Sequence, residues 1–128
     1  MANPNVVNVS TITGVTTFIA DISATTVTTV VSNTAASNQV YKINSVIASN
    51  KTASSANISL KIFNAPVPSS AGTGSSVSIG TTISVPSGST LVILGKDSPI
   101  YVTESNSLGA NAGTASAIDV VASYEVIS

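Results

Sequence analysis

The 128-residue sequence contains no cysteine, no histidine and no tryptophan. The lack of cysteine excludes disulfides, and the lack of both cysteine and histidine removes the usual ligand sets of protein zinc sites. An enzyme built from this chain would have only Ser, Thr, Lys, Asp and Glu to serve as nucleophile, acid or base. We therefore predict a non-enzymatic protein with no catalytic residues, no metal site and no cofactor.

Charge is also scarce. Four lysines and five acidic residues give a formal net charge of −1. A nucleic-acid-binding protein needs clustered Lys and Arg to displace counterions, and a polybasic membrane patch needs the same residues. The composition therefore argues against both nucleic acid and membrane as partners. Because a low net charge favours self-association, we expect a homo-oligomer.

Long apolar runs are missing as well. No stretch reaches the ~18 consecutive apolar residues of a transmembrane helix. The opening segment "MANPNVVNVS" has neither the basic region nor the long apolar run of a signal peptide. We expect a protein made in the cytoplasm without a membrane span.

The residues that are abundant indicate β-structure. Ser and Thr make up 39 residues and Asn 11, yet 43% of the chain is hydrophobic. Disordered chains combine low hydrophobicity with high charge, which is the opposite balance. The many Thr, Val and Ile residues are β-branched and suit pleated strands. The length fits one domain.

Alternation of apolar and polar residues predicts half-buried strands at 39–49, 56–64 and 117–128. Residues 90–95, "TLVILG", are apolar on both faces and predict a central strand. Residues 75–85 predict one strand broken at Gly80 by a bend or a bulge. Loops are expected at 33–38, 49–55, 64–76 and 109–116. The fold class we predict is all-β, an antiparallel, jelly-roll-like β-sandwich of about eight strands.

The first 32 residues differ from the rest, because they are rich in Thr and carry only Asp21 as a charge. We predict one or two strands there, around 14–22 and 25–31. They form either an N-terminal arm that reaches a neighbouring subunit or extra strands on the 33–128 sandwich. The predicted partner-interface residues of this segment are Val15, Phe18, Ile19, Val27 and Val30.

Few side chains suggest chemistry. Lys96 and Asp97 in "GKDSP" could contact an ion or substrate, but a solvated turn between strands explains them better. Asp119 and Glu125 share one face of a strand and lie ~20 Å apart, too far for a paired-carboxylate site. We expect Tyr101 to be the exposed tyrosine, with the tyrosines of the other strands in the core.

Three stretches of the second half carry a resemblance: "VPSGSTLVIL" (85–94), "SPIYVTESNSL" (98–108) and "AIDVVASYEVI" (117–127). Together they resemble small virion proteins of tailed bacteriophages, notably of marine and cyanobacterial phages. The matching residues are Pro86, Gly88 and Ser89, then Pro99, Ile100 and Tyr101, then Ser107 and Leu108, and finally Val120, Val121, Ser123, Tyr124 and Glu125. The resemblance covers about residues 56–128. It departs at "SNSL", where those proteins have a Gly-Asp turn.

This resemblance implies a structural subunit of the virion. The function we expect is a capsid decoration or cement protein that binds across major capsid proteins and stabilises the head, with a trimer favoured. One alternative is a neck, tail or fibre component of the same virion. Another, of a different class, is a host-surface glycan-binding module that uses the loops at 64–76 and 109–116.

Overall fold

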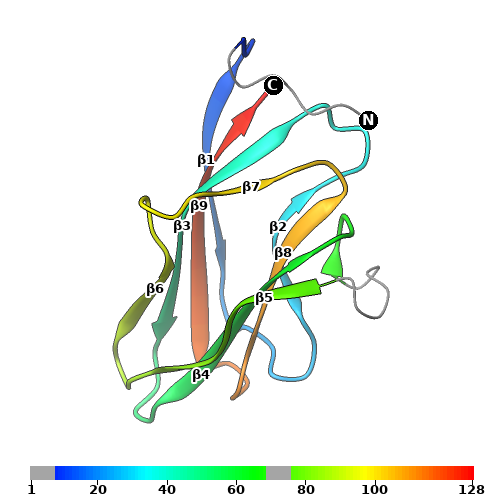
Figure 1. The fold of residues 1–128 in the computed structure, drawn as a ribbon. Helices are drawn as coiled ribbons and strands as arrows, with labels where there is room; N and C mark the ends of the chain where they lie inside the picture. Colours follow the sequence, from blue (N-terminus) through cyan, green and yellow to red (C-terminus); the bar gives the residue numbers. More distant parts are fainter. Residues whose placement is uncertain (1–7, 69–75) are drawn as a thin grey trace.

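The structure is a computed structural model that describes residues 8–68 and 76–128, and these residues form nine strands and no α-helix (Figure 1). The strands are β1 (Ile12–Ile19), β2 (Thr28–Asn33), β3 (Val40–Asn50), β4 (Ala56–Phe63), β5 (Ser76–Val85), β6 (Thr90–Leu94), β7 (Ile100–Val102), β8 (Asn106–Ala112) and β9 (Ile118–Ile127). The all-β prediction is confirmed, with nine strands where about eight were expected. The same described residues contain no helix long and apolar enough to cross a membrane.

Two antiparallel sheets pack against each other as a β-sandwich. Sheet A has the order β1-β9-β3-β6, and β7 pairs with β3 as its fifth strand. Sheet B has the order β2-β8-β4-β5. The core lies between the sheets and is formed by aliphatic side chains from both, including Val46, Ile58, Leu60, Leu108 and Val120.

Strand β9 is the strand predicted for the 117–128 segment, and it lies inside sheet A, between β1 and β3. Ile118, Val120 and Ala122 are buried in the core, whereas Val121 points outward and is 38% exposed. The prediction for residues 90–95 is wrong, because β6 lies at the edge of sheet A and not at its centre. The outer side chains of β6 are therefore exposed, Val92 to 57%.

The segment 1–32 supplies strands to both sheets. Of its described residues, 8–32, β1 pairs with β9 along its whole length, and β2 pairs with β8. The chain crosses from sheet A to sheet B at Asp21, which has a left-handed φ of 58°. Residues 8–32 thus contribute β1 to sheet A and β2 to sheet B, and residues 1–7 lie outside the described part.

A buried asparagine links the two sheets near one end of the sandwich. Asn50, at the end of β3, is 1% exposed. Its Nδ2 donates to the carbonyl oxygens of Val85 (2.9 Å) and Ser54 (2.8 Å), and Val85 belongs to β5 in the other sheet. Its Oδ1 accepts from the backbone N–H (2.9 Å) and the hydroxyl (2.8 Å) of Thr52. Every hydrogen-bonding group of this buried amide is therefore satisfied.

A second buried asparagine does the same between β2 and β7. Asn33 is fully buried, and its Nδ2 donates to the carbonyl oxygens of Val102 and Gln39, both at 2.9 Å. The Ser37 hydroxyl donates to its Oδ1 at 2.5 Å. The two asparagines thus join sheet A to sheet B at two separate places.

Strand β5 contains the predicted irregularity near Gly80. The β4–β5 register shifts between Ile58 and Leu60, so that two residues of β5 oppose the single residue Ser59 of β4. Thr82 lies in this bulge with a left-handed φ of 51°, and its N–H donates to Ser59 Oγ at 2.8 Å. A β-branched residue rarely adopts this conformation, so the bulge stores local strain.

Candidate functional site

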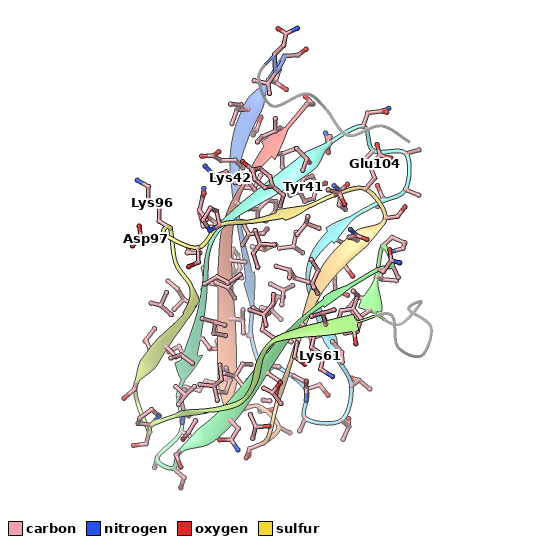
Figure 2. The ribbon with its side chains drawn as sticks, in the orientation of Figure 1. Tyr41, Lys42, Lys61, Lys96, Asp97 and Glu104 are labelled. Atoms are coloured by element: carbon pink, nitrogen blue, oxygen red, sulfur yellow. The ribbon has the colours of Figure 1, made fainter. Side chains whose placement is uncertain are left out.

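The charged side chains lie scattered around the sandwich (Figure 2). Lys96 and Asp97 are exposed in the turn between β6 and β7, where the Ser98 N–H donates to the Gly95 carbonyl at 3.0 Å. This is the arrangement expected of a solvated turn. Within residues 8–68 and 76–128, no three acidic side chains come close enough to hold a metal ion.

Lys51, Asp21 and Asp119 interact with one another. Lys51 Nζ forms an ion pair with Asp119 Oδ1 at 3.0 Å and a second ion pair with Asp21. The Asp21 N–H donates to Asp119 Oδ1 at 2.9 Å. This backbone hydrogen bond, and then Lys51, lower the pKa of Asp119, while the hydrogen bonds from Lys51 to Asp21 and Asp119 raise the pKa of Lys51. The three side chains are partly exposed, and their ion pairs lie at the crossing between the sheets, where pairs of this kind contribute little stability.

The aromatic side chains divide between the interior and the outer face of sheet A. Tyr41 and Tyr124 stack with their ring centroids 5.3 Å apart, and burial is the main cause that raises the pKa of Tyr41. Tyr101 is 47% exposed, as predicted. Phe18 is the most exposed large hydrophobic residue, at 80%. An exposed phenylalanine needs an explanation, because its ring carries a large apolar surface.

Phe18 is one end of an apolar row that crosses sheet A on its outer face. Phe18 lies directly opposite Val121, Val121 opposite Ile47, and Ile47 opposite Val92. Side chains opposed in this way stand about 5 Å apart on one face of a sheet. We call these four residues, Phe18, Val121, Ile47 and Val92, the outer row.

Polar residues border the outer row on both sides. The next positions toward one end of the strands are Thr16, Ser123 and Ser45, which again oppose one another across β1, β9 and β3. Toward the other end lie Asp119, Ser49 and Thr90, on β9, β3 and β6. The outer row is therefore a narrow apolar stripe with a polar rim, which is the arrangement of a protein interaction surface.

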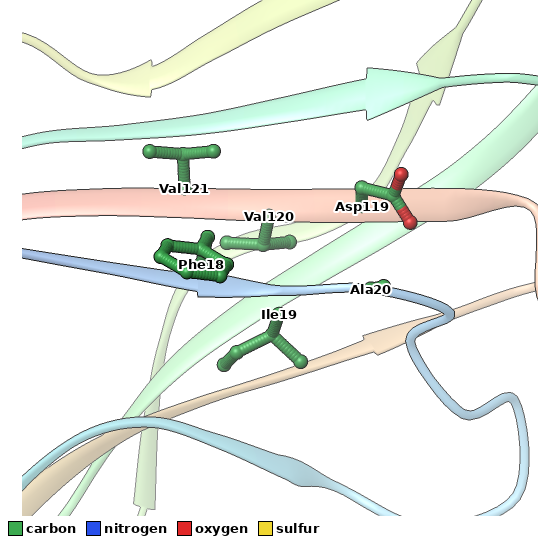
Figure 3. Close-up of a pocket in the computed structure, with 6 residues that line it drawn as sticks. All are labelled: Phe18, Ile19, Ala20, Asp119, Val120 and Val121. Atoms are coloured by element: carbon green, nitrogen blue, oxygen red, sulfur yellow. The ribbon is translucent and has the colours of Figure 1, made fainter.

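A shallow hollow of about 190 Å³ adjoins the Phe18 end of the outer row (Figure 3). Its lining residues are Phe18, Ile19, Ala20, Asp119, Val120 and Val121. Small-molecule pockets usually enclose roughly 300–1,000 Å³. The hollow is thus the size of a side chain, and it suits a contact with another protein better than a ligand.

The five predicted interface residues fall into three groups. Phe18 and Val27 are exposed, to 80% and 37%, and offer apolar surface. Val15 and Ile19 are partly buried, and Ile19 packs against the core. Val30 is 3% exposed and belongs to the core, because β2 turns it inward between the sheets. Its side chain has no free surface to offer a partner.

Neither a protein-family model nor a curated protein sequence matches this chain. The candidate site therefore depends on the geometry of the chain itself.

Half of the expected glycan-binding loop at 109–116 is strand. Residues 109–112 belong to β8, and only the residues after them form a turn. Gly109 is buried where β8 meets its neighbours, and a Cβ there would approach Val27 Cγ1 to 2.5 Å and Pro68 Cγ to 2.8 Å. Part of the other expected loop, residues 69–75, lies outside the described residues.

Val121, Ile47 and Val92 were not predicted from the sequence to form a surface. The sequence did indicate such a surface, because each strand of the outer row has two consecutive apolar residues, a doublet, where the row crosses it. The doublets are Phe18–Ile19, Val120–Val121, Val46–Ile47 and Leu91–Val92. In each doublet one residue enters the core and the other points outward. A doublet in a sheet with one solvated face therefore indicates an apolar outer surface.

Proposed function

We propose that this protein is a non-enzymatic structural subunit that attaches to a larger protein assembly through the outer row of sheet A. The observation that carries the proposal is the row itself, four aligned apolar side chains of which Phe18, Val92 and Val121 are 80%, 57% and 38% exposed. Apolar surface buried on association contributes about 25 cal/mol per Å² before the costs of binding. An apolar stripe across four strands can therefore hold each copy of the subunit on its binding site in the assembly.

The assembly we propose is the virion of a tailed bacteriophage, with this chain as a capsid decoration or cement protein bound across major capsid proteins. The support is the resemblance of residues 56–128 to small phage virion proteins, together with the sandwich fold and the sparse charge. A cement protein acts by burying surface across capsomer boundaries. Repetition over a shell turns modest contacts into resistance to internal pressure.

Copy number tests this proposal. We expect hundreds of copies per purified phage particle, measured by quantitative mass spectrometry and located on the head by electron microscopy. A dozen copies or fewer would support the alternative of a neck, tail or fibre component. Absence from purified particles would refute both.

A pair of matched variants tests the surface. Val92 in the outer row and Val77 on β5 are both exposed valines on edge strands, at 57% and 67%, but they belong to different sheets. We expect Val92→Lys to weaken attachment to particles that lack the chain by about tenfold or more, because a charge would be buried at the contact. Val77→Lys should bind like the wild type. Equal binding by all three proteins would show that the outer row is not the attachment surface.

A further inference from the structure

Strand β1 forms an edge of sheet A and is hydrogen-bonded to one described neighbour, β9. Its sequence, ITGVTTFI, contains no charged residue and no proline. Natural sheets usually protect an edge with lysine, proline, a bulge or a covering segment, because an unprotected edge pairs with other strands. The β1–β9 register is also regular over all eight residues of β1, without a bulge.

The hydrogen-bond alternation shows which groups of β1 are free to bind. Just before β1, Thr11 exchanges two backbone hydrogen bonds with Ser128, at 3.1 and 3.0 Å. In an antiparallel pair such residues alternate with residues whose N–H and C=O point away from the neighbour. The even-numbered residues of β1 therefore direct their backbone groups to the free edge. These residues are Ile12, Gly14, Thr16 and Phe18.

We propose that β1 pairs antiparallel with β1 of a second copy, across a two-fold axis at Val15. This register joins the edge-directed groups in hydrogen-bonded pairs, Gly14 with Thr16 of the second copy and Ile12 with Phe18 of the second copy. Ile12 and Phe18 are the two large exposed hydrophobic residues of the strand, at 57% and 80%. An aromatic residue opposite a β-branched residue is a favourable cross-strand pair. The strand is thus complementary to itself.

The same pairing extends the outer row. Ile12 of the second copy lies beside Phe18 on the outer face, so each row gains one apolar residue from the partner. Antiparallel pairing of identical strands requires a two-fold axis. It therefore gives a dimer, or an assembly built from dimers, in place of the trimer favoured from the sequence.

The contact area supports a second copy as the occupant. Eight paired residues extend ~27 Å, and a sheet with its side chains is ~10 Å thick, so β1 offers roughly 270 Å² per protomer. The edge of β2 lies beside β1 in the other sheet, and the two-fold axis brings the two β2 edges together as well. Its six residues add roughly 200 Å². The total of about 950 Å² over both protomers is below the ~1,200–2,000 Å² of stable interfaces, so the area fits a weak dimer whose population depends on concentration.

Gly14 allows a selective test. A Cβ at Gly14 meets no atom within 4 Å, so a side chain fits, and the N–H of Gly14 is directed to the free edge. Gly14→Pro removes that donor and places the ring against the partner strand without removing a β1–β9 hydrogen bond. Gly14→Ala is the matched control, because it adds the same Cβ and keeps the N–H.

Sedimentation of the full chain from about 1 µM to 1 mM measures the association. We expect a dimer for the wild type and Gly14→Ala, and at least about thirtyfold weaker dimerisation for Gly14→Pro. Val92→Lys should dimerise normally. The proposal of attachment through the outer row and the proposal of pairing through β1 can therefore fail independently of each other. A wild-type monomer over this whole range, a trimer, or a Gly14→Pro dimer as tight as the wild type would each overturn the proposal.

Amide hydrogen exchange of the wild type gives a second readout that needs no variant. The N–H groups of Ile12, Gly14, Thr16 and Phe18 should exchange fast at low concentration and become protected at high concentration. The N–H groups of Thr13, Val15, Thr17 and Ile19 bind β9 and should be protected throughout. Protection of the first set that does not change with concentration, or never develops, would refute pairing through this edge.

Discussion

Replacement of Asn50 by alanine should strongly destabilise the fold. The side chain is 1% exposed and makes four hydrogen bonds, two as donor and two as acceptor. An intramolecular hydrogen bond contributes about 1 kcal/mol net, and a buried group left without a partner costs roughly 1–3 kcal/mol. Because Val85 O would lose its partner inside the sandwich, we expect Asn50→Ala to lower the free energy of unfolding by about 4 kcal/mol.

Urea unfolding followed by far-ultraviolet circular dichroism measures this loss. Asn111→Ala is the control, because Asn111 is half-buried on β8 and its side chain makes no hydrogen bond to a described residue. It should change the stability by no more than about 0.5 kcal/mol. A loss below about 1 kcal/mol for Asn50→Ala would refute the view that this amide holds the two sheets together.

Asn50→Asp should make the free energy of unfolding depend on pH. The new carboxylate would face the carbonyl oxygens of Val85 and Ser54, so burial and repulsion should raise its pKa above the ~3.9 of an unfolded chain. A raised folded-state pKa means that the variant is most stable below the unfolded pKa and loses stability as the pH rises. The deficit of Asn50→Asp relative to the wild type should therefore grow from about pH 4 upward. A deficit that is constant from acid to neutral pH would contradict this reasoning.

Three further predictions concern other sites. Thr82→Gly should raise the free energy of unfolding by about 1 kcal/mol, because it relieves a left-handed φ, whereas Thr81→Gly, at ordinary φ, should lower it by a similar amount in the same urea titration. Ser107→Ala should also raise stability by about 1 kcal/mol, because the buried Ser107 hydroxyl has no partner among the described residues, and an unchanged midpoint would argue for a hidden partner. Because the pKa of Asp119 is lowered in the folded protein, its carboxylate stabilises the fold above the unfolded pKa of ~3.9. This stability is lost as the pH falls through the folded-state pKa. Asp119→Asn should therefore make the melting temperature depend less steeply on pH in the acid range.

The interior strands could be predicted from the sequence because one of their faces is buried. In β9, Ile118, Val120 and Ala122 alternate with more polar or more exposed residues, and the alternation determines which face enters the core. The bulge in β5 was also predictable, since a glycine within a strand pattern often marks one.

The edge strands could not be predicted in the same way. Residues 90–95 are apolar on both faces, which is typical of a central strand, but β6 lies at an edge with Val92 exposed. The order of strands in a sheet depends on contacts between segments far apart in the chain, and periodicity does not report these contacts. The candidate site was missed in part for this reason, because the outer row exists only once β1, β9, β3 and β6 lie side by side.

The strand order described above also has a consequence for the speed of folding. Among the paired strands of the described chain, only β4 and β5 follow each other in sequence. Every other ladder, including β1–β9, joins segments separated by at least one further strand. Closing such large loops costs entropy before the contacts repay it, and sandwiches of this kind fold in milliseconds to seconds. We expect the β4–β5 hairpin to be the one local nucleus, with sheet A completed only when β9 inserts between β1 and β3.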